Sequence, residues 1–103
     1  MNDLQTTARG IFPSDAKERK TFPMYRGLIK YFPNALAAVA NLSYRGNQQH
    51  HPDKPLHWDQ DKSTDEADAL IRHLMEGDYV AAAWRALALA ERNSTGELRE
   101  DSL

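Results

Sequence analysis

The sequence predicts an all-α fold, a small helical bundle of three to four helices. Apolar residues recur at three- and four-residue spacing in three segments, at about 33–44, 65–75 and 78–92, which is the period of an amphipathic helix. No segment shows the alternation of apolar and polar residues that is typical of a strand. Three short helices bury little apolar surface in a chain of 103 residues, so we expect oligomerisation to complete the core.

Composition divides the chain into three parts. Residues 1–21 are polar and charged, and we expect them to form a flexible N-terminal arm. Residues 22–92 hold the apolar periodicity and form the predicted helical domain. Residues 93–103 return to a polar composition, which predicts a frayed C-terminal tail.

Three Phe-Pro steps, Phe12-Pro13, Phe22-Pro23 and Phe32-Pro33, lead up to the first predicted long helix. Pro23 and Pro33 each disfavour helix at the phenylalanine that precedes them, so the stretch between them is predicted to be extended or irregular. A short helix from Met24 to Tyr31 is the alternative. The first long helix is predicted from Pro33 or Asn34 to Tyr44, because proline suits a first helical turn and Gly46 is a natural end.

A predicted loop and a capped helix follow. The loop from Gly46 to Lys62 is long and poor in aliphatic residues, and loops of this length are usually functional or disordered. Ser63 and Glu66 then have the spacing of a capping box, in which the two side chains satisfy backbone N–H groups at a helix start. This helix is predicted to run from Asp65 to about Met75, with Gly77 ending it.

The last helix is predicted from about Asp78 to Arg92, and Asn93 and Gly96 are expected to end it. Its apolar face carries Trp84 among alanines and leucines. A tryptophan is too large for three short helices to cover well, and this strengthens the expectation of a second subunit.

Composition also excludes several classes of protein. The net charge of -2 argues against nucleic-acid binding, which normally needs a basic excess. The chain has no cysteine, which rules out disulfides, thiol nucleophiles and zinc–thiolate sites. No apolar run has the length of a membrane span and no signal peptide is evident, so we expect a cytoplasmic protein that does not enter the membrane.

Asp65 and Asp68 are the candidate metal ligands. They lie three residues apart and can share one face of the capped helix, where two carboxylates would form half of a magnesium site in an all-α protein. The alternative is that they are ordinary acids of a first helical turn, which complement the helix dipole. The residues alone leave both interpretations open.

Lys62, Arg72 and His73 are the candidate phosphate ligands. Arginine offers a bidentate fork, and Lys62 precedes a helix N-terminus, which itself attracts anions. The alternative for Arg72 is a surface ion pair with Asp68, worth a few tenths of a kcal/mol.

Trp58 is the candidate base-stacking residue. A tryptophan in a polar loop either fills the core or stacks on a planar ligand, and the first of these is the more common. The neighbouring His57 would border the same site. His50, His51 and His57 suggest zinc, but no pair has the four-residue helical spacing and no HExxH motif is present, so the sequence argues against a histidine metal site.

Several of these residues also carry a resemblance to a known family. It rests on FPMYRGLIKYFPNALAAVANLSYRGNQQH, PLHWD, KSTDEADALIRHLMEGD and AAWRALALAE, which together cover about residues 22–92. These strings resemble the N-terminal domain of phage-type dATP/dGTP diphosphohydrolases and related small phage domains, in the MazG-like all-α pyrophosphohydrolase group. The resemblance implies Mg²⁺-dependent hydrolysis of a deoxynucleoside triphosphate to monophosphate and pyrophosphate, in the host cytoplasm if the chain is phage-encoded.

The chain departs from MazG-like enzymes in its acids. Those enzymes hold magnesium with a Glu-x-x-Glu pair on one helix and a Glu-x-x-Asp pair on the next, whereas this chain has Asp65-x-x-Asp68 and no acid on its first long helix. The alternatives to hydrolysis are therefore a nucleotide-binding protein without catalysis, such as one that sequesters a nucleotide from a host defence, and a protein-interaction module.

The expected roles follow from the first interpretation. Asp65 and Asp68 would hold magnesium and, with His73, act in catalysis. The residues that would bind the nucleotide substrate are Lys62, Arg72, Trp58 and His57.

Overall fold

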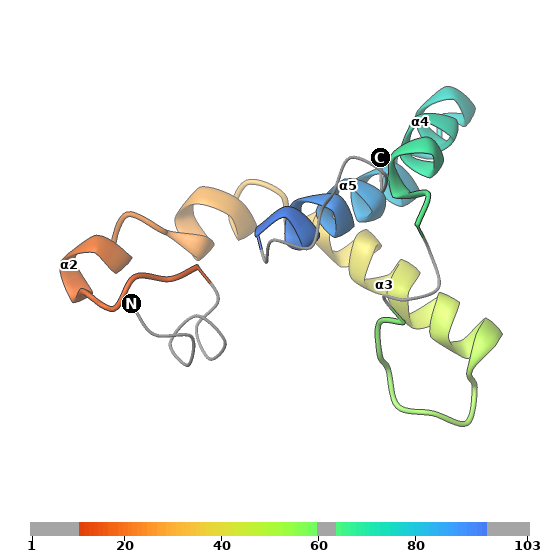
Figure 1. Ribbon diagram of the computed structural model, residues 1–103, viewed down its shortest axis with the longest axis horizontal. Coiled ribbons are helices and arrows are strands. Elements are labelled where there is room, and N and C mark those ends of the chain that lie inside the picture. The colour runs from red at the N-terminus through yellow and green to blue at the C-terminus, as the bar shows by residue number, and fades with distance from the viewer. Residues whose placement is uncertain (1–10, 60–63, 95–103) are drawn as a thin grey trace. The chain divides into compact units, whose positions relative to one another are not determined.

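A computed structural model of the chain describes residues 11–59 and 64–94. The chain divides into two compact units, Met1–Pro33 and Asn34–Leu103, and each is described by itself. All regular elements in the described ranges are helical, five in number, with no strand among them (Figure 1). The all-α prediction is confirmed. None of the helices in this described part is both long and apolar enough to cross a lipid bilayer.

The described part of the first unit, residues 11–33, contains two short helical elements. Helix α2 (Ala16–Arg19) is a single turn, and the Asp15 carboxylate caps it by accepting from the backbone N–H of Glu18 at 2.9 Å. The η1 element (Tyr25–Ile29) is a π-helical turn, so the predicted alternative of a short helix in this stretch is confirmed. The flexibility expected of residues 1–21 stays a prediction, and residues 1–10 lie outside the described ranges.

Helix α3 (Pro33–His50) begins at the predicted proline but ends later than predicted. The prediction that Gly46 ends the helix is wrong. Gly46 continues the helix, and the next residue, Asn47, is buried there. The side-chain amide of Asn47 donates to the backbone carbonyls of His51 at 3.4 Å and Lys54 at 3.1 Å. These tertiary bonds outweigh the cost of a glycine inside a helix, about 1 kcal/mol.

Helices α4 (Glu66–Glu76) and α5 (Tyr79–Ser94) pack against each other and are joined by a two-residue turn. Gly77 ends α4 as predicted, with a left-handed φ of 76°, and the backbone N–H of Asp78 donates to the carbonyl of His73. The Asp78 carboxylate then accepts from the backbone N–H of Ala81 at 3.2 Å, so it caps α5.

The predicted bounds of these two helices shift slightly. Asp65 and Asp78 precede the helices as flanking residues, and α5 runs through Ser94, two residues beyond its predicted end. The predicted cap Ser63 lies outside the described residues, as does Gly96. The side chain of Asp65 makes no capping bond to α4.

The core of the second unit is small. Among its residues that the structure describes, the buried apolar ones are one valine and four alanines: Val39, Ala69, Ala81, Ala82 and Ala88. Trp84 is half-buried and joins α5 to α3, because its indole Nε1–H donates to Ser43 Oγ at 2.7 Å. Larger apolar side chains of α4 remain exposed, among them Ile71, Leu74 and Met75.

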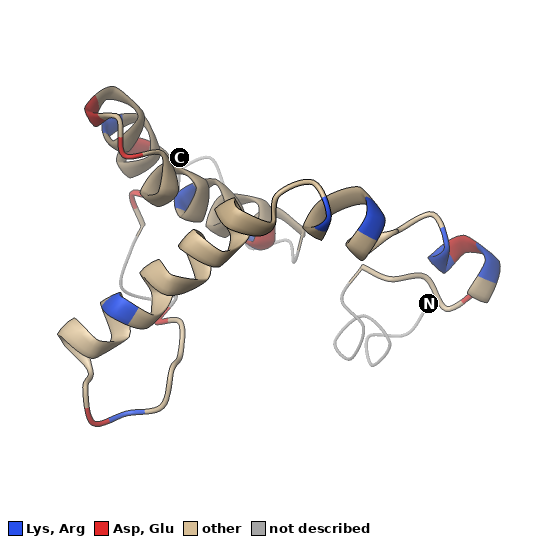
Figure 2. Cartoon of the chain, turned by 180° about the vertical axis from the view of Figure 1, so that it is seen from behind, with Lys and Arg blue, Asp and Glu red and all other residues tan. Residues whose placement is uncertain are grey.

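An ionic cluster supplements this core. Glu66, at the start of α4, is 1% exposed and is the largest fully buried side chain of the described residues. Its Oε1 accepts from Arg85 of α5, and its Oε2 lies 3.8 Å from Nη2 of Arg92. The carboxylate therefore ties the middle and the C-terminal end of α5 to α4. The long α3, by contrast, carries a single charged residue, Arg45 (Figure 2).

Candidate functional site

A cavity of about 790 Å³ lies within the second unit. Its walls come from the C-terminal half of α3, the loop 51–59, and the facing parts of α4 and α5. The size falls in the range of small-molecule sites. One wall is aromatic, formed by Trp58 and Trp84, and the polar side chains that line it include His73, Asp78 and Arg85.

The loop 51–59 is folded by its own backbone and by α3. The carbonyl of His51 accepts from the backbone N–H of Lys54 at 3.1 Å, which closes a turn. Asn47 fastens this turn to the helix through its two side-chain bonds. At the far end of the loop, Trp58 packs edge-on against Trp84, with ring centroids 5.5 Å apart and an interplanar angle of 83°.

Trp58 combines the two roles that the sequence left open. It is half-buried against Trp84, which is a packing role, and it lines the cavity, where part of its surface is available to a ligand. The guanidinium carbon of Arg85 lies 5.8 Å from the centroid of the Trp84 ring, within cation–π range. The Arg85 guanidinium therefore contacts both the Trp84 ring and the Glu66 carboxylate.

Two polar residues of α4, Glu66 and His73, line the cavity. Nδ1 of His73 lies 3.5 Å from Oε1 of Glu76 and 4.0 Å from Oδ2 of Asp78. The Glu66 carboxylate, in contrast, is engaged by Arg85 and Arg92, which gives it a structural role.

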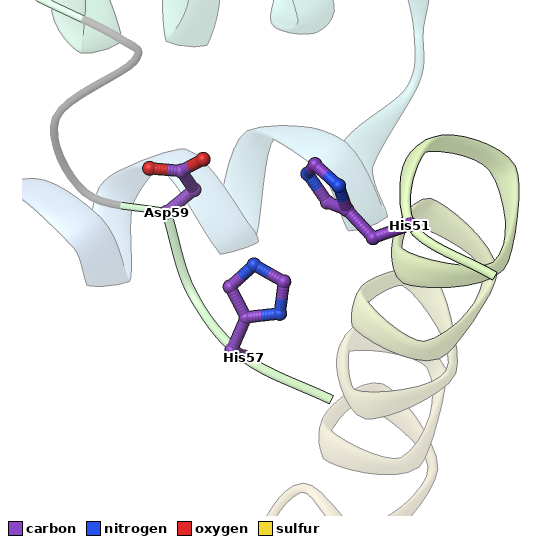
Figure 3. Close-up of side chains that lie close together, drawn as sticks. All are labelled: His51, His57 and Asp59. Carbon is purple, nitrogen blue, oxygen red and sulfur yellow. The ribbon is translucent and has the colours of Figure 1, made fainter. Parts of the chain in front are cut away.

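Three ligand-type side chains meet at the wall formed by the loop. The donor atoms of His51, His57 and Asp59 all lie within 4.8 Å of one another (Figure 3). The sequence suggested His51 and His57 but argued against a metal site there, and it did not indicate Asp59, because the three residues belong to a folded loop rather than to one helix face. Their spacing in the chain has no helical period, and only the turn at 51–54 brings His51 near the other two.

The predicted site residues divide into two groups. His57, Trp58 and His73 line the cavity, as a shared ligand site requires. Asp65 and Arg72 do not line it; they form an exposed ion pair, with Asp65 Oδ2 at 3.7 Å from Arg72 Nη2.

Asp68 is exposed on α4 and does not line the cavity either. The surface ion pair considered for Arg72 therefore exists, but with Asp65 in place of Asp68. Lys62 lies outside the described residues. The prediction that Asp65 and Asp68 hold magnesium stays a prediction.

Sequence reasoning missed several cavity residues, among them Asp59, Asp78 and Arg85. Arg85 follows a tryptophan on a helix, where a charged residue usually marks the solvent face. Asp78 had a local signal, since an aspartate before a helix start predicts a cap, but that signal does not indicate a cavity.

Comparisons of the chain with protein-family models, with curated proteins and with solved structures return no match. The resemblance to phage-type dATP/dGTP diphosphohydrolases therefore rests on the quoted sequence strings alone.

Proposed function

We propose that the chain binds a deoxynucleoside triphosphate in the cavity and hydrolyses it to a monophosphate and pyrophosphate with the help of Mg²⁺. The observation that carries the proposal is the composition of the cavity, in which two tryptophans and nitrogen-bearing side chains such as His73 and Arg85 line the same space. The resemblance over residues 22–92 gives the reaction and the substrate class.

The aromatic wall suits the base. Trp58 and Trp84 are both half-buried, and a purine can stack on an exposed part of either ring. Stacking on aromatic side chains contributes about 1–3 kcal/mol per base. Because every base has a π-face, this wall alone leaves the base preference open.

The charged groups suit the phosphates, provided that a cation accompanies them. Arg85 and His73 offer nitrogen donors at the cavity wall. Arg72, which lies outside the cavity, could reach a phosphate only if that group extended toward the exposed side of α4. The wall also carries Asp59 and Asp78, which would repel a bare triphosphate. This balance of charge favours a metal-bound nucleotide over a free one.

Asp65 and Asp68 fit magnesium in their chemistry. Both are exposed carboxylates at the start of α4, and an exposed pair leaves room for the several waters that Mg²⁺ keeps. When bound, the ion would neutralise phosphate charge and activate a water molecule. Asp65 and Asp68 do not line the cavity themselves. Glu66, which follows Asp65 directly in the sequence, does line it.

We also propose that a second copy of the chain covers the exposed apolar face of α4. Ile71, Leu74 and Met75 share one side of that helix, and Met75 is 83% exposed. A core of one valine and four alanines buries little area by itself, so self-association would add the missing burial.

The test measures pyrophosphate release from each of the four deoxynucleoside triphosphates, with and without Mg²⁺. We expect Mg²⁺-dependent release from a purine substrate, and we expect Trp58→Ala to weaken binding in calorimetry. Tyr79→Ala is the matched control, since Tyr79 is an exposed aromatic residue that does not line the cavity.

If nucleotide raises the Tm of the chain but no pyrophosphate is released, hydrolysis is refuted. That result would support the alternative function, nucleotide binding without catalysis. Absence of both binding and release, in the presence of Mg²⁺, would refute a nucleotide function and favour a protein-interaction module.

A further inference from the structure

His51, His57 and Asp59 form a compact group of metal-ligand type at the wall of the cavity. Their donor atoms all lie within 4.8 Å of one another, and their side chains point toward a common space (Figure 3). We propose that these three residues bind a divalent transition metal of the zinc class. This site is separate from the aspartates proposed for magnesium, and it does not depend on the nucleotide function.

The donor set selects the class of metal. Two imidazoles and one carboxylate suit Zn²⁺ and its transition-metal neighbours, whereas Mg²⁺ prefers oxygen ligands alone. In a tetrahedral zinc site the donor atoms are about 3.3 Å apart, given bonds of about 2.0–2.1 Å. The present spread of up to 4.8 Å is wider, so binding requires a small inward movement of these side chains, of which His57 and Asp59 are exposed.

The tautomer of His57 is favourable for binding. Its Nδ1 lies 3.0 Å from the carbonyl oxygen of Pro55. When Nδ1 donates its proton to that oxygen, the lone pair stands on Nε2, the other ring nitrogen. Metal-binding histidines commonly make such a bond with the nitrogen that is not on the metal, because it fixes the orientation of the ring.

The backbone that carries the three residues is held on both sides. Near His51, the buried Asn47 side chain and the Lys54 backbone N–H both donate to the His51 carbonyl, at 3.4 and 3.1 Å. Trp58, which separates the other two ligands, packs on Trp84 of α5. The rings of His51 and His57 are already close, with centroids 4.9 Å apart. Little further ordering of the loop is then needed when the metal binds.

The position of the group gives the metal a chemical use. All three residues line the cavity, so a metal held by them would lie in its wall. Three protein ligands leave one coordination position of a tetrahedral ion open, as in catalytic rather than structural zinc sites. That position can accept a water molecule or an oxygen of a ligand in the cavity.

The experiment uses the full chain, without a polyhistidine tag and without nucleotide, titrated with Zn²⁺ in a calorimeter and with Co²⁺ in a spectrophotometer. We expect one ion per chain and a visible Co²⁺ absorption band. His57→Ala and Asp59→Asn should each weaken Zn²⁺ binding at least about tenfold. The matched controls are His50→Ala and Asp53→Asn, neighbouring exposed residues outside the group, which should leave the affinity unchanged.

Circular dichroism of each variant shows whether the helices are intact, and we expect them to be, because the substituted side chains are exposed. The proposal is wrong if the chain takes up no Zn²⁺ at micromolar concentration. It is equally wrong if His57→Ala binds Zn²⁺ as tightly as His50→Ala does. Failure of nucleotide hydrolysis leaves both measurements unaffected, so the two proposals can fail separately.

Discussion

Replacing Glu66 by glutamine tests whether an ionic cluster holds α4 and α5 together. The substitution keeps the size of the side chain but removes the charge that faces Arg85 and Arg92. Removing one member of a buried ion pair typically costs about 3–5 kcal/mol, because the other charge is left without compensation. The side chains of the two arginines are 29% and 11% exposed, so water can partly solvate them. We therefore expect the lower end of that range, about 3 kcal/mol.

Such a loss is large for this chain. A domain of this size typically unfolds with about 5–15 kcal/mol. Each kcal/mol corresponds to about 4–8 °C in Tm for a domain near 100 residues, so Glu66→Gln should lower Tm by about 12–24 °C. Urea unfolding followed by circular dichroism gives the free energy of unfolding. If the dependence of this free energy on urea concentration is unchanged, the substitution has left the compactness of the folded and unfolded states unaltered.

The control for Glu66→Gln is Glu91→Gln, which removes the same charge from an exposed position on α5 and should change stability by at most about 0.5 kcal/mol. The single variant Arg85→Gln and the double variant Glu66→Gln/Arg85→Gln complete a double-mutant cycle. We expect a coupling energy of about 1–3 kcal/mol between the two side chains. Equal stability of the Glu66 and Glu91 variants would refute the structural role of the buried carboxylate.

Four other predictions concern the site and the assembly. If Asp65 and Asp68 hold magnesium, Asp65→Asn and Asp68→Asn each abolish Mg²⁺-dependent hydrolysis with the fold intact. If the two acids only complement the helix dipole, the same substitutions lower the stability by at most about 1 kcal/mol and leave turnover unchanged. Arg72→Lys keeps the charge but loses the bidentate fork, so calorimetry should show weaker nucleotide binding, whereas an exposed ion pair with no ligand role would leave it unaltered. In a Trp84→Phe background, Trp58 fluorescence should change on nucleotide binding, and constant emission at calorimetrically proven saturation would remove Trp58 from the site. Light scattering at micromolar concentration should give a mass above that of one chain, and a clean monomer mass would contradict self-association.

Local chemistry in the sequence determined the helices and several of their ends. Gly77 was predicted to end α4, because its lack of a side chain permits the left-handed backbone that a helix C-terminus uses, and its φ of 76° agrees. Pro33 marked the start of α3 for an equally local reason, since its fixed φ suits a first turn. These signals act within a few residues of chain, so no tertiary information was needed to find them.

Tertiary contacts decided what local signals left open. Gly46 looked like a helix end, but the buried amide of Asn47 extends α3 by bonding to the loop beyond it. Glu66 looked like half of a capping box, but its carboxylate turns into the interior, where Arg85 and Arg92 engage it. In both cases a partner on another segment overrides the local preference.

The candidate site shows the same division between sequence and structure. Residue type and loop length were enough to select His57 and Trp58, because a tryptophan in a polar loop is unusual wherever it occurs. The meeting of His51 and Asp59 with His57 was beyond the sequence, because it depends on a turn closed by the Lys54 N–H and fastened by Asn47. Sequence spacing reports neighbours along regular helices and strands, whereas the geometry of a folded loop is fixed only by the contacts that hold it.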